Sequence, residues 1–539
     1  MASILPSPPE PDSPVAPHPV GNQWSQRFFF GVLWSWAGVA ATFFTGFFLS
    51  PYIIRQLGDS RYGMWALAFA FIDYFVLFDF GFKSAAVNFL SRAKAEGDEQ
   101  QINEIVNTSL FYFLGIAGFL LGLTYAISGS LHLWFQITPE YRREFLILIR
   151  IIAIGWATAI ALNIFNAGME AFQQFKAQNS ISVLVLILRS GGCAIAVYLG
   201  YGLIVMGVIV LIGQVITYAL MFRSFRHTFP ALRISPDLIR IAIWKRMARY
   251  GSHAFVAYLG NMLLGQGPPI LIGRFRVESY VGYYALPSRL LQNVADLVTR
   301  IGYVTMPNAA ELAERGQYAK IVQLGTYLNR YCFALFMPVG LFLLVFGREL
   351  IQVWVGVGFA DQSAPLLPAF VLMTMLAVAG QFNSSVILFG LAKHDTYAKA
   401  LLAEAVLSLI VMALVLPVYG LVGASWVAAA FAIINRGLVT PYLLSRTLQF
   451  SLLSYLRGIH LVPALLAVPV LGYAYWIKSQ WLAGRNWFEL LTILGLIALP
   501  YYGACYFAIM EGEHRALLKE WIRALTVSRL APSGEPPQP

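Results

Sequence analysis

The chain has 539 residues, of which 58% are hydrophobic and 12% are charged, and its mean hydropathy is +0.67. A soluble globular protein carries about 25% charged residues, so this composition excludes a soluble enzyme and a disordered scaffold. The apolar excess extends through the whole chain, which excludes a receptor with one membrane span and predicts a polytopic membrane protein. The net charge of +11 fits Lys and Arg on cytoplasmic loops, and no soluble domain remains to bind nucleic acid.

Residues 1–22 are rich in proline and lack a basic stretch before an apolar segment, so they are predicted to be a disordered cytoplasmic tail. About fourteen apolar segments follow. Each must be a helix, because backbone groups in lipid need partners within their own segment. The predicted spans are 28–50, 63–83, 106–130, 145–168, 179–200, 203–222, 250–272, 281–306, 323–347, 365–391, 398–416, 421–443, 459–477 and 488–510.

The distribution of loop charge predicts that both termini are cytoplasmic, because the loops on that side hold most of the loop Lys and Arg. The most basic loop follows span six and is expected to contact anionic lipid headgroups. Its cations are Arg223, Arg226, Arg233, Arg240, Lys245, Arg246 and Arg249. The predicted domains are an N-terminal lobe at 23–222, the linker at 223–249, a C-terminal lobe at 250–443, two further spans at 444–510 and a cytoplasmic tail at 511–539.

An internal repeat relates the two lobes. At an offset of 219 residues, Arg55 matches Arg274 and Gly63 matches Gly282, and the Tyr-Gly-Leu sequence that begins at Tyr201 recurs close to the same offset. Both lobes start on the same side and contain an even number of spans. The repeat is therefore parallel, with its axis along the membrane normal, as in two-lobed transporters.

Several short motifs resemble one transporter family. Residues 50–67 resemble the first external loop of oligosaccharide flippases, and residues 77–82, 93–98 and the Tyr-Gly-Leu turns also match. Over about residues 24–510, the chain is similar to the polysaccharide transporters of O-antigen flippase type, in the multidrug/oligosaccharidyl-lipid/polysaccharide (MOP) superfamily. It departs from the pattern in its long Pro-rich N-terminus and in having no charge inside span one.

The resemblance implies an all-α protein with two six-helix lobes around a central cavity and two C-terminal helices outside the repeat. It also implies alternating access that flips a polyprenyl-pyrophosphate-linked oligosaccharide across the bacterial inner membrane, for surface polysaccharide synthesis. Polysaccharide polymerase and other biosynthesis proteins are the implied partners, and no cofactor or metal is expected.

Span eight carries the clearest candidate site. Arg289, Gln292, Asn293, Asp296 and Arg300 fall on one stripe of a helix. Charge inside a membrane is costly, so the stripe should face an aqueous cavity or a partner helix. Because the guanidinium fork matches phosphate oxygens, the two arginines are predicted to bind an anionic headgroup. Alternatively, Asp296 and Arg300 form an ion pair that only joins helices.

Three other arginines are candidate substrate ligands. Arg55 and Arg274 are related by the repeat and are expected at the external mouth of the lobes, where they could instead snorkel to the interface. Arg189 lies near the middle of span five, where snorkelling is hardest.

Acidic residues inside spans are candidates for coupling. Asp73 in span two and Glu404 in span eleven could bind a proton or a cation, or could pair with an arginine of another span. Asp79 and Lys83 are one helical turn apart and are expected to neutralise each other.

Span seven contains a candidate gate hinge at Gly267, Pro268 and Pro269. The two prolines remove two backbone donors, so the helix is expected to break there. The alternative is a static kink.

Three classes of function were compared. A cation-coupled drug exporter would need an acidic cavity, whereas the span interiors hold more Lys and Arg than Asp and Glu. A lipid II flippase would share the cationic cavity. A membrane enzyme would need ionisable residues on large external loops, and the longest loops, at 131–144 and 348–364, hold few. The sequence therefore predicts a flippase and not an enzyme.

Overall fold

The computed structural model describes residues 45–299, 305–480, 486–512 and 514–516. Every regular element in these ranges is a helix, and one isolated β-bridge joins Gln136 to Val277. Ten stretches are long and apolar enough to cross a membrane. The predicted all-α, multi-pass membrane architecture is thus confirmed. The tail at 1–22, most of span one, Arg300 and most of the C-terminal tail lie outside the described residues.

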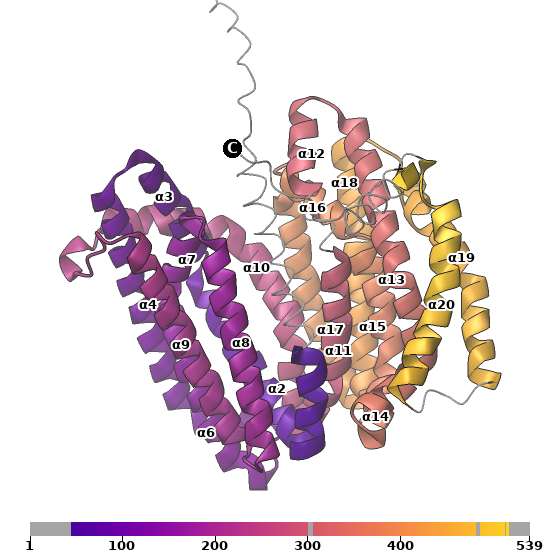
Figure 1. The fold of residues 1–539 in the computed structure, drawn as a ribbon, viewed down its shortest axis with the longest axis horizontal. Coiled ribbons are helices and arrows are strands. Elements are labelled where there is room, and N and C mark those ends of the chain that lie inside the picture. Colours follow the sequence, from indigo (N-terminus) through magenta and orange to yellow (C-terminus); the bar gives the residue numbers. More distant parts are fainter. Residues whose placement is uncertain (1–44, 300–304, 481–485, 513, 517–539) are drawn as a thin grey trace, which may run out of the picture.

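The first half of the chain forms an N-terminal bundle (Figure 1). A helix at 45–57 ends at Gly58, whose positive φ of 84° turns the chain into the next helix. Asp98 starts α4 by accepting a hydrogen bond from the backbone N–H of Gln101 at 2.8 Å. The helices are α2 (Asp59–Asp73), the 3₁₀ turn η1 (Tyr74–Asp79), α3 (Phe82–Glu96), α4 (Glu99–Ser128), α5 (Leu131–Trp134), α6 (Arg142–Ala161), α7 (Asn163–Ala171), α8 (Phe175–Tyr198) and α9 (Leu203–Thr228).

The second half forms a C-terminal bundle. Its helices are α11 (Glu278–Thr299), α12 (Thr305–Glu314), α13 (Tyr318–Trp354), α14 (Val357–Ser363), α15 (Leu367–Met373), the π-helix η6 (Thr374–Ala379), α16 (Phe382–Gly390), α17 (His394–Ala432), the π-helix η7 (Ile433–Val439), α18 (Thr440–Leu448), α19 (Leu452–Gln480) and α20 (Trp487–Ala508). Within α17, Gly420 is not helical, with φ 62° and ψ −153°. The ion pair between Glu404 and Arg436 joins positions equally far before and after this glycine, so the chain folds back there as a hairpin, as the predicted spans eleven and twelve require.

Helix α10 (Ile241–Phe275) belongs to both bundles. Near its start, the ring of Trp244 lies 6.2 Å from that of Phe82 in the N-terminal bundle. Near its end, Gly267 faces Leu409 of α17, only 2.7 Å from where a Cβ atom would stand. The expected break at Gly267–Pro269 is wrong, because α10 continues through both prolines. Its packing against α17 on this side holds the backbone helical in spite of the missing hydrogen bonds.

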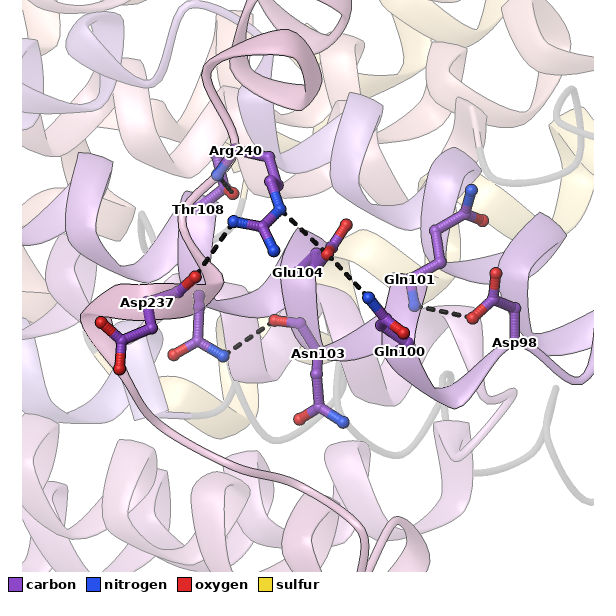
Figure 2. Close-up of polar contacts among 9 residues, drawn as sticks. Asp98, Gln100, Gln101, Asn103, Glu104, Thr108, Asp237 and Arg240 are labelled. Atoms are coloured by element: carbon purple, nitrogen blue, oxygen red, sulfur yellow. Dashed lines mark hydrogen bonds and ion pairs between the residues drawn. The ribbon is translucent and has the colours of Figure 1, made fainter.

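The segment that enters α10 is fixed to the start of α4. The side-chain amide of Asn103 accepts from the Arg233 N–H at 2.7 Å and donates to the Ala231 carbonyl at 3.1 Å. Asn107 makes the same kind of pair with the Ser235 N–H and the Arg233 carbonyl, at 2.9 and 2.7 Å. Figure 2 shows that Arg240 also reaches Glu104, at 3.0 Å. This part of the predicted linker is therefore clamped to the N-terminal bundle.

The two bundles meet at the end of the molecule that carries α14 and diverge towards the end that carries α3 and α12 (Figure 1). Helices α2 and α11 cross where Gly63 and Gly282, the pair related by the repeat, touch each other. A Cβ atom on Gly63 would lie 1.8 Å from the Glu278 carbonyl oxygen, and one on Gly282 would lie 3.4 Å from the Gly63 Cα. Only glycine permits this close approach of the two backbones.

Candidate functional site: a cavity between the two bundles

A cavity of about 470 Å³ lies between the bundles, among α2, α10 and α11. We call it the central cavity. It is large enough for a small ligand or a headgroup. The polar side chains that line it include Asp73, Gln266, Ser288, Arg289, Gln292 and Asn293.

The polar stripe of α11 forms one wall of this cavity. Arg289 and Gln292 are exposed, whereas Leu290, Leu291 and Ala295 on the other face of the helix are buried. The amphipathic pattern of α11 therefore turns its polar face away from the helices that it packs against. Asp296 continues the stripe beyond the cavity and accepts a hydrogen bond from Gln292 at 3.0 Å.

The two charged side chains of the central cavity, Asp73 and Arg289, differ in their hydrogen-bond partners. Asp73 is half-buried and accepts a hydrogen bond from the Gln266 side-chain amide at 3.0 Å. Arg289 has no hydrogen bond or ion pair with any described residue, although it is near enough to Asp73 to interact with it electrostatically. Its guanidinium donors can therefore all bind an anion that enters the cavity.

Arg55 lies on the contact between the bundles and not in the central cavity. Its guanidinium donates to the carbonyls of Val353 and Val355 at the end of α13. Nearby, the Trp354 indole donates to the Phe47 carbonyl at 2.6 Å.

Further contacts join the two bundles at the same end of the molecule. We call these contacts, together with those of Arg55 and Trp354, the seal. The Gln136 N–H donates to the Gly273 carbonyl at 2.9 Å, beside the Gln136–Val277 bridge. Thr138 donates through both its N–H and its hydroxyl to the Glu278 carboxylate, at 3.0 and 2.8 Å. The Tyr283 hydroxyl donates to Asp59 at 2.7 Å. The sequence did not reveal these contacts, because they join residues 140 and 224 positions apart.

The other predicted arginines lie away from the central cavity. Arg274 is exposed at the rim of an apolar cavity of about 680 Å³ that η1, α4, α5 and α10 line. Arg189 packs its aliphatic stem against Gly213 of α9. Of the candidate substrate arginines that the structure describes, only Arg289 faces the central cavity.

Glu404 does not line the central cavity, and both of its carboxylate oxygens have partners. It is buried within the α17 hairpin, where it pairs with Arg436 at 3.0 Å and accepts from the Asn435 amide at 2.8 Å. In span seven, Pro269 lines the central cavity and Gly267 packs against α17.

The predicted pairing of the Asp79 and Lys83 side chains is wrong. The Lys83 ammonium pairs with Glu170 of α7 at 2.7 Å, while Asp79 accepts from the Lys83 backbone N–H at 3.1 Å. Asp79 therefore acts on the first turn of α3. The side chain of Lys83 reaches Glu170 because α3 and α7 pack together, which a pairing rule within one helix cannot foresee.

A second cavity, of about 600 Å³, was missed in the sequence. It lies beside η1, α3, α7 and α10, and Asp79, Lys83 and Glu170 line it. The sequence does contain a pattern that indicates a polar helix face at this place. Ser84, Asn88 and Ser91 recur at helical spacing just after the predicted end of span two.

Comparisons with known proteins agree with this architecture. The family model described as polysaccharide biosynthesis protein matches residues 29–313. A structure of the lipid II flippase MurJ in an inward closed conformation has a TM-score of 0.70 at 15% identity, and the alignment covers 88% of this chain and 99% of that one.

An inward-facing multidrug resistance MATE family transporter of the MOP superfamily has a TM-score of 0.61 at 14% identity, covering 75% of this chain and 95% of that one. No curated protein sequence matches the chain. These solved structures share the fold, and the family model spans more than half of the residues. The chain belongs to the polysaccharide biosynthesis protein family.

Proposed function

We propose that this protein is a flippase that moves a polyprenyl-pyrophosphate-linked oligosaccharide across the bacterial inner membrane. The observation that carries the proposal is Arg289, whose guanidinium lies on the wall of a cavity between two related bundles and has no hydrogen bond or ion pair with any residue that the structure describes. Such a group is permanently charged and matches phosphate oxygens. Membership of the polysaccharide biosynthesis family supports a glycan carried on a lipid.

In this proposal the lobes of 23–222 and 250–443 move against each other, while 444–510 lies outside the repeat. Both termini and the basic linker face the cytoplasm, so the seal is external and the cavities open inward. The headgroup binds at Arg289, the seal then separates, and the open end closes. Gly267–Pro269 is the place where α10 bends, because the missing proline donors lower the cost of bending. The released lipid then serves a polysaccharide polymerase outside.

A drug exporter of the same fold is the second candidate, and Asp73 is the observation that favours it. Asp73 lines the central cavity and could bind a cation or a proton. Glu404 gives this candidate no support, because Arg436 already balances its charge. Lipid II is an alternative substrate, since it presents a polyprenyl pyrophosphate as well.

The test is translocation in vesicles that contain the purified full chain. One set carries a polyprenyl-pyrophosphate oligosaccharide on one leaflet, a second carries lipid II and a third contains a lipophilic cation. A membrane-impermeant sugar-modifying enzyme reports arrival of either lipid on the other side. Protein-dependent movement of the oligosaccharide lipid is expected. Movement of the cation alone would replace the proposal by the exporter, and movement of lipid II alone would change the substrate.

A further inference from the structure

The second cavity is built from one polar face of α3 and two neighbouring elements. Ser84, Asn88 and Ser91 follow one another along that face, whereas Ala85, Ala86, Leu90 and Ala93 on the opposite face are buried. The Ser84 hydroxyl and the Asn88 amide have no hydrogen-bond partner among the described residues. Such groups lose little by exchanging water for a ligand that offers hydroxyls and amides.

Aromatic side chains line the opposite side. The rings of Phe80 and Phe255 lie 5.2 Å apart with their planes at 38°. Phe80 is 42% exposed and Tyr258 is 44% exposed, and all three line the cavity. Aromatic faces opposite hydrogen-bonding groups suit a ligand with apolar C–H faces and polar edges. A sugar ring has both.

The charges of the second cavity restrict that ligand further. Lys83 and Glu170 form an ion pair at 2.7 Å, so their charges offset each other. Asp79 accepts a hydrogen bond from the Lys83 backbone N–H, and the lining therefore holds two carboxylates, Asp79 and Glu170, and one ammonium group. Placing another carboxylate beside Asp79 is unfavourable by like-charge repulsion. The cavity therefore suits neutral or amino sugars and disfavours acidic sugars.

The two cavities share one face of α10. Phe255 and Tyr258 line the second cavity, and Gly265 and Pro269 line the central cavity. Tyr258 and Gly265 are two helical turns apart, which is about 10 Å along the helix axis. The second cavity is therefore within reach of sugars attached to a pyrophosphate at Arg289.

We infer that the second cavity is the saccharide subsite of the transported lipid, selective for neutral or amino sugars over uronic acids. The inference rests on the proposed function and adds to it a class of sugar and the residues that select it. Asn88 and Ser84 hydrogen-bond the saccharide, and Asp79 excludes acidic rings.

The experiment compares three probes in the vesicle assay. They are polyprenyl pyrophosphate with no sugar, the same lipid with an N-acetylhexosamine disaccharide, and the same lipid with a disaccharide containing glucuronic acid. The wild-type protein is expected to move the neutral glycolipid about tenfold faster than the acidic one. The Ser84→Ala/Asn88→Ala variant should slow the neutral glycolipid about tenfold and leave the sugar-free lipid unchanged.

Asp79→Asn should remove the discrimination against glucuronic acid, since asparagine can still cap α3 without a charge. Ser182→Ala is the matched control, because Ser182 lies exposed on α8 and its hydroxyl donates to the Gln178 carbonyl of the same helix. Unchanged transport of both glycolipids by both cavity variants would overturn the subsite while leaving the flippase in place. Failure of every polyprenyl lipid to move would reject the flippase and the subsite together. Movement of a lipophilic cation that Asp79→Asn alone abolishes would assign the cavity to organic cations instead.

Discussion

The basic side chains within the membrane-spanning helices differ in what they contact. Arg150 donates to Ser128 at 2.9 Å, Arg330 donates to the Gly458 carbonyl at 2.6 Å, and Arg436 pairs with Glu404. None of these three side chains lines the central cavity. Arg289 differs because its helix presents it to a cavity. Counting cations in the sequence therefore overstated the positive charge available to a substrate.

We predict that Arg289→Ala lowers translocation at least tenfold. A hydrogen bond to a charged group is worth about 1.5–3 kcal/mol. Arg289→Lys should keep part of the rate, because the charge survives without the planar fork. The readout is the initial rate in the vesicle assay, normalised to protein in the membrane.

The matched control for this prediction is Arg446→Ala. Among the described residues, the Arg446 side chain interacts with Tyr442 on its own helix, through a 2.9 Å hydrogen bond and the ring face. Equal rates for Arg289→Ala and Arg446→Ala would show that the polar stripe of α11 is structural.

Among elements, the crossing of α2 and α11 brings the backbones of the two bundles into direct contact. We predict that Gly63→Ala destabilises the protein by about 1–3 kcal/mol, the usual cost of overpacking, because the new methyl would stand 1.8 Å from the Glu278 carbonyl oxygen. Thermal unfolding in detergent should show a lower midpoint. Gly118→Ala in α4 is the control, because its Cβ meets nothing within 4 Å. An equal midpoint in both variants would contradict the crossing.

The 229–240 segment is held to α4 by the side chains of Asn103 and Asn107, and this contact gives a second prediction about the elements. Asn103→Ala/Asn107→Ala removes four side-chain hydrogen bonds that join α4 to the backbone of this segment. The segment should then open more often and expose Arg233 to trypsin. We expect cleavage after Arg233 to become about tenfold faster, as follows from losing roughly 1 kcal/mol or more. Gln101→Ala on the same helix should cleave at the wild-type rate. Unchanged cleavage in the double variant would mean that other contacts hold the segment.

The sequence was informative about elements wherever a periodic pattern or a repeat specified them. Hydropathy predicted the all-α membrane architecture, and the repeat paired Gly63 with Gly282. The sequence pattern was misleading for α10, because residues 241–249 have the composition of a basic loop. In the structure the helix begins at Ile241, since Trp244 packs against the N-terminal bundle. The sequence prediction also missed the second cavity, whose walls come from segments far apart in the chain.

At the scale of the whole molecule, the seal keeps one end closed, so alternating access requires these contacts to separate. We predict that a disulfide between Gln136→Cys and Val277→Cys stops transport and that a reductant restores it. Residues paired across a β-bridge lie within the Cα separation that a disulfide spans. The native Cys193, Cys332 and Cys505 are buried and free, so they should not compete.

Each single-cysteine variant serves as the control and should transport with or without oxidant. Full transport by the oxidised double variant, with the cross-link verified on a gel, would mean that this end does not open.

The meeting of Gly63 with Gly282 has a consequence for how the two halves are related. The same position of each half contacts itself, which is the geometry of an isologous interface in a homodimer with twofold symmetry. In that sense the chain is a tethered dimer of two similar bundles. The tether is the clamped 229–240 segment, and it acts by raising the effective concentration of each bundle near the other. The repeated helix face itself therefore specifies how the two halves pack together, and the linker keeps them close to each other.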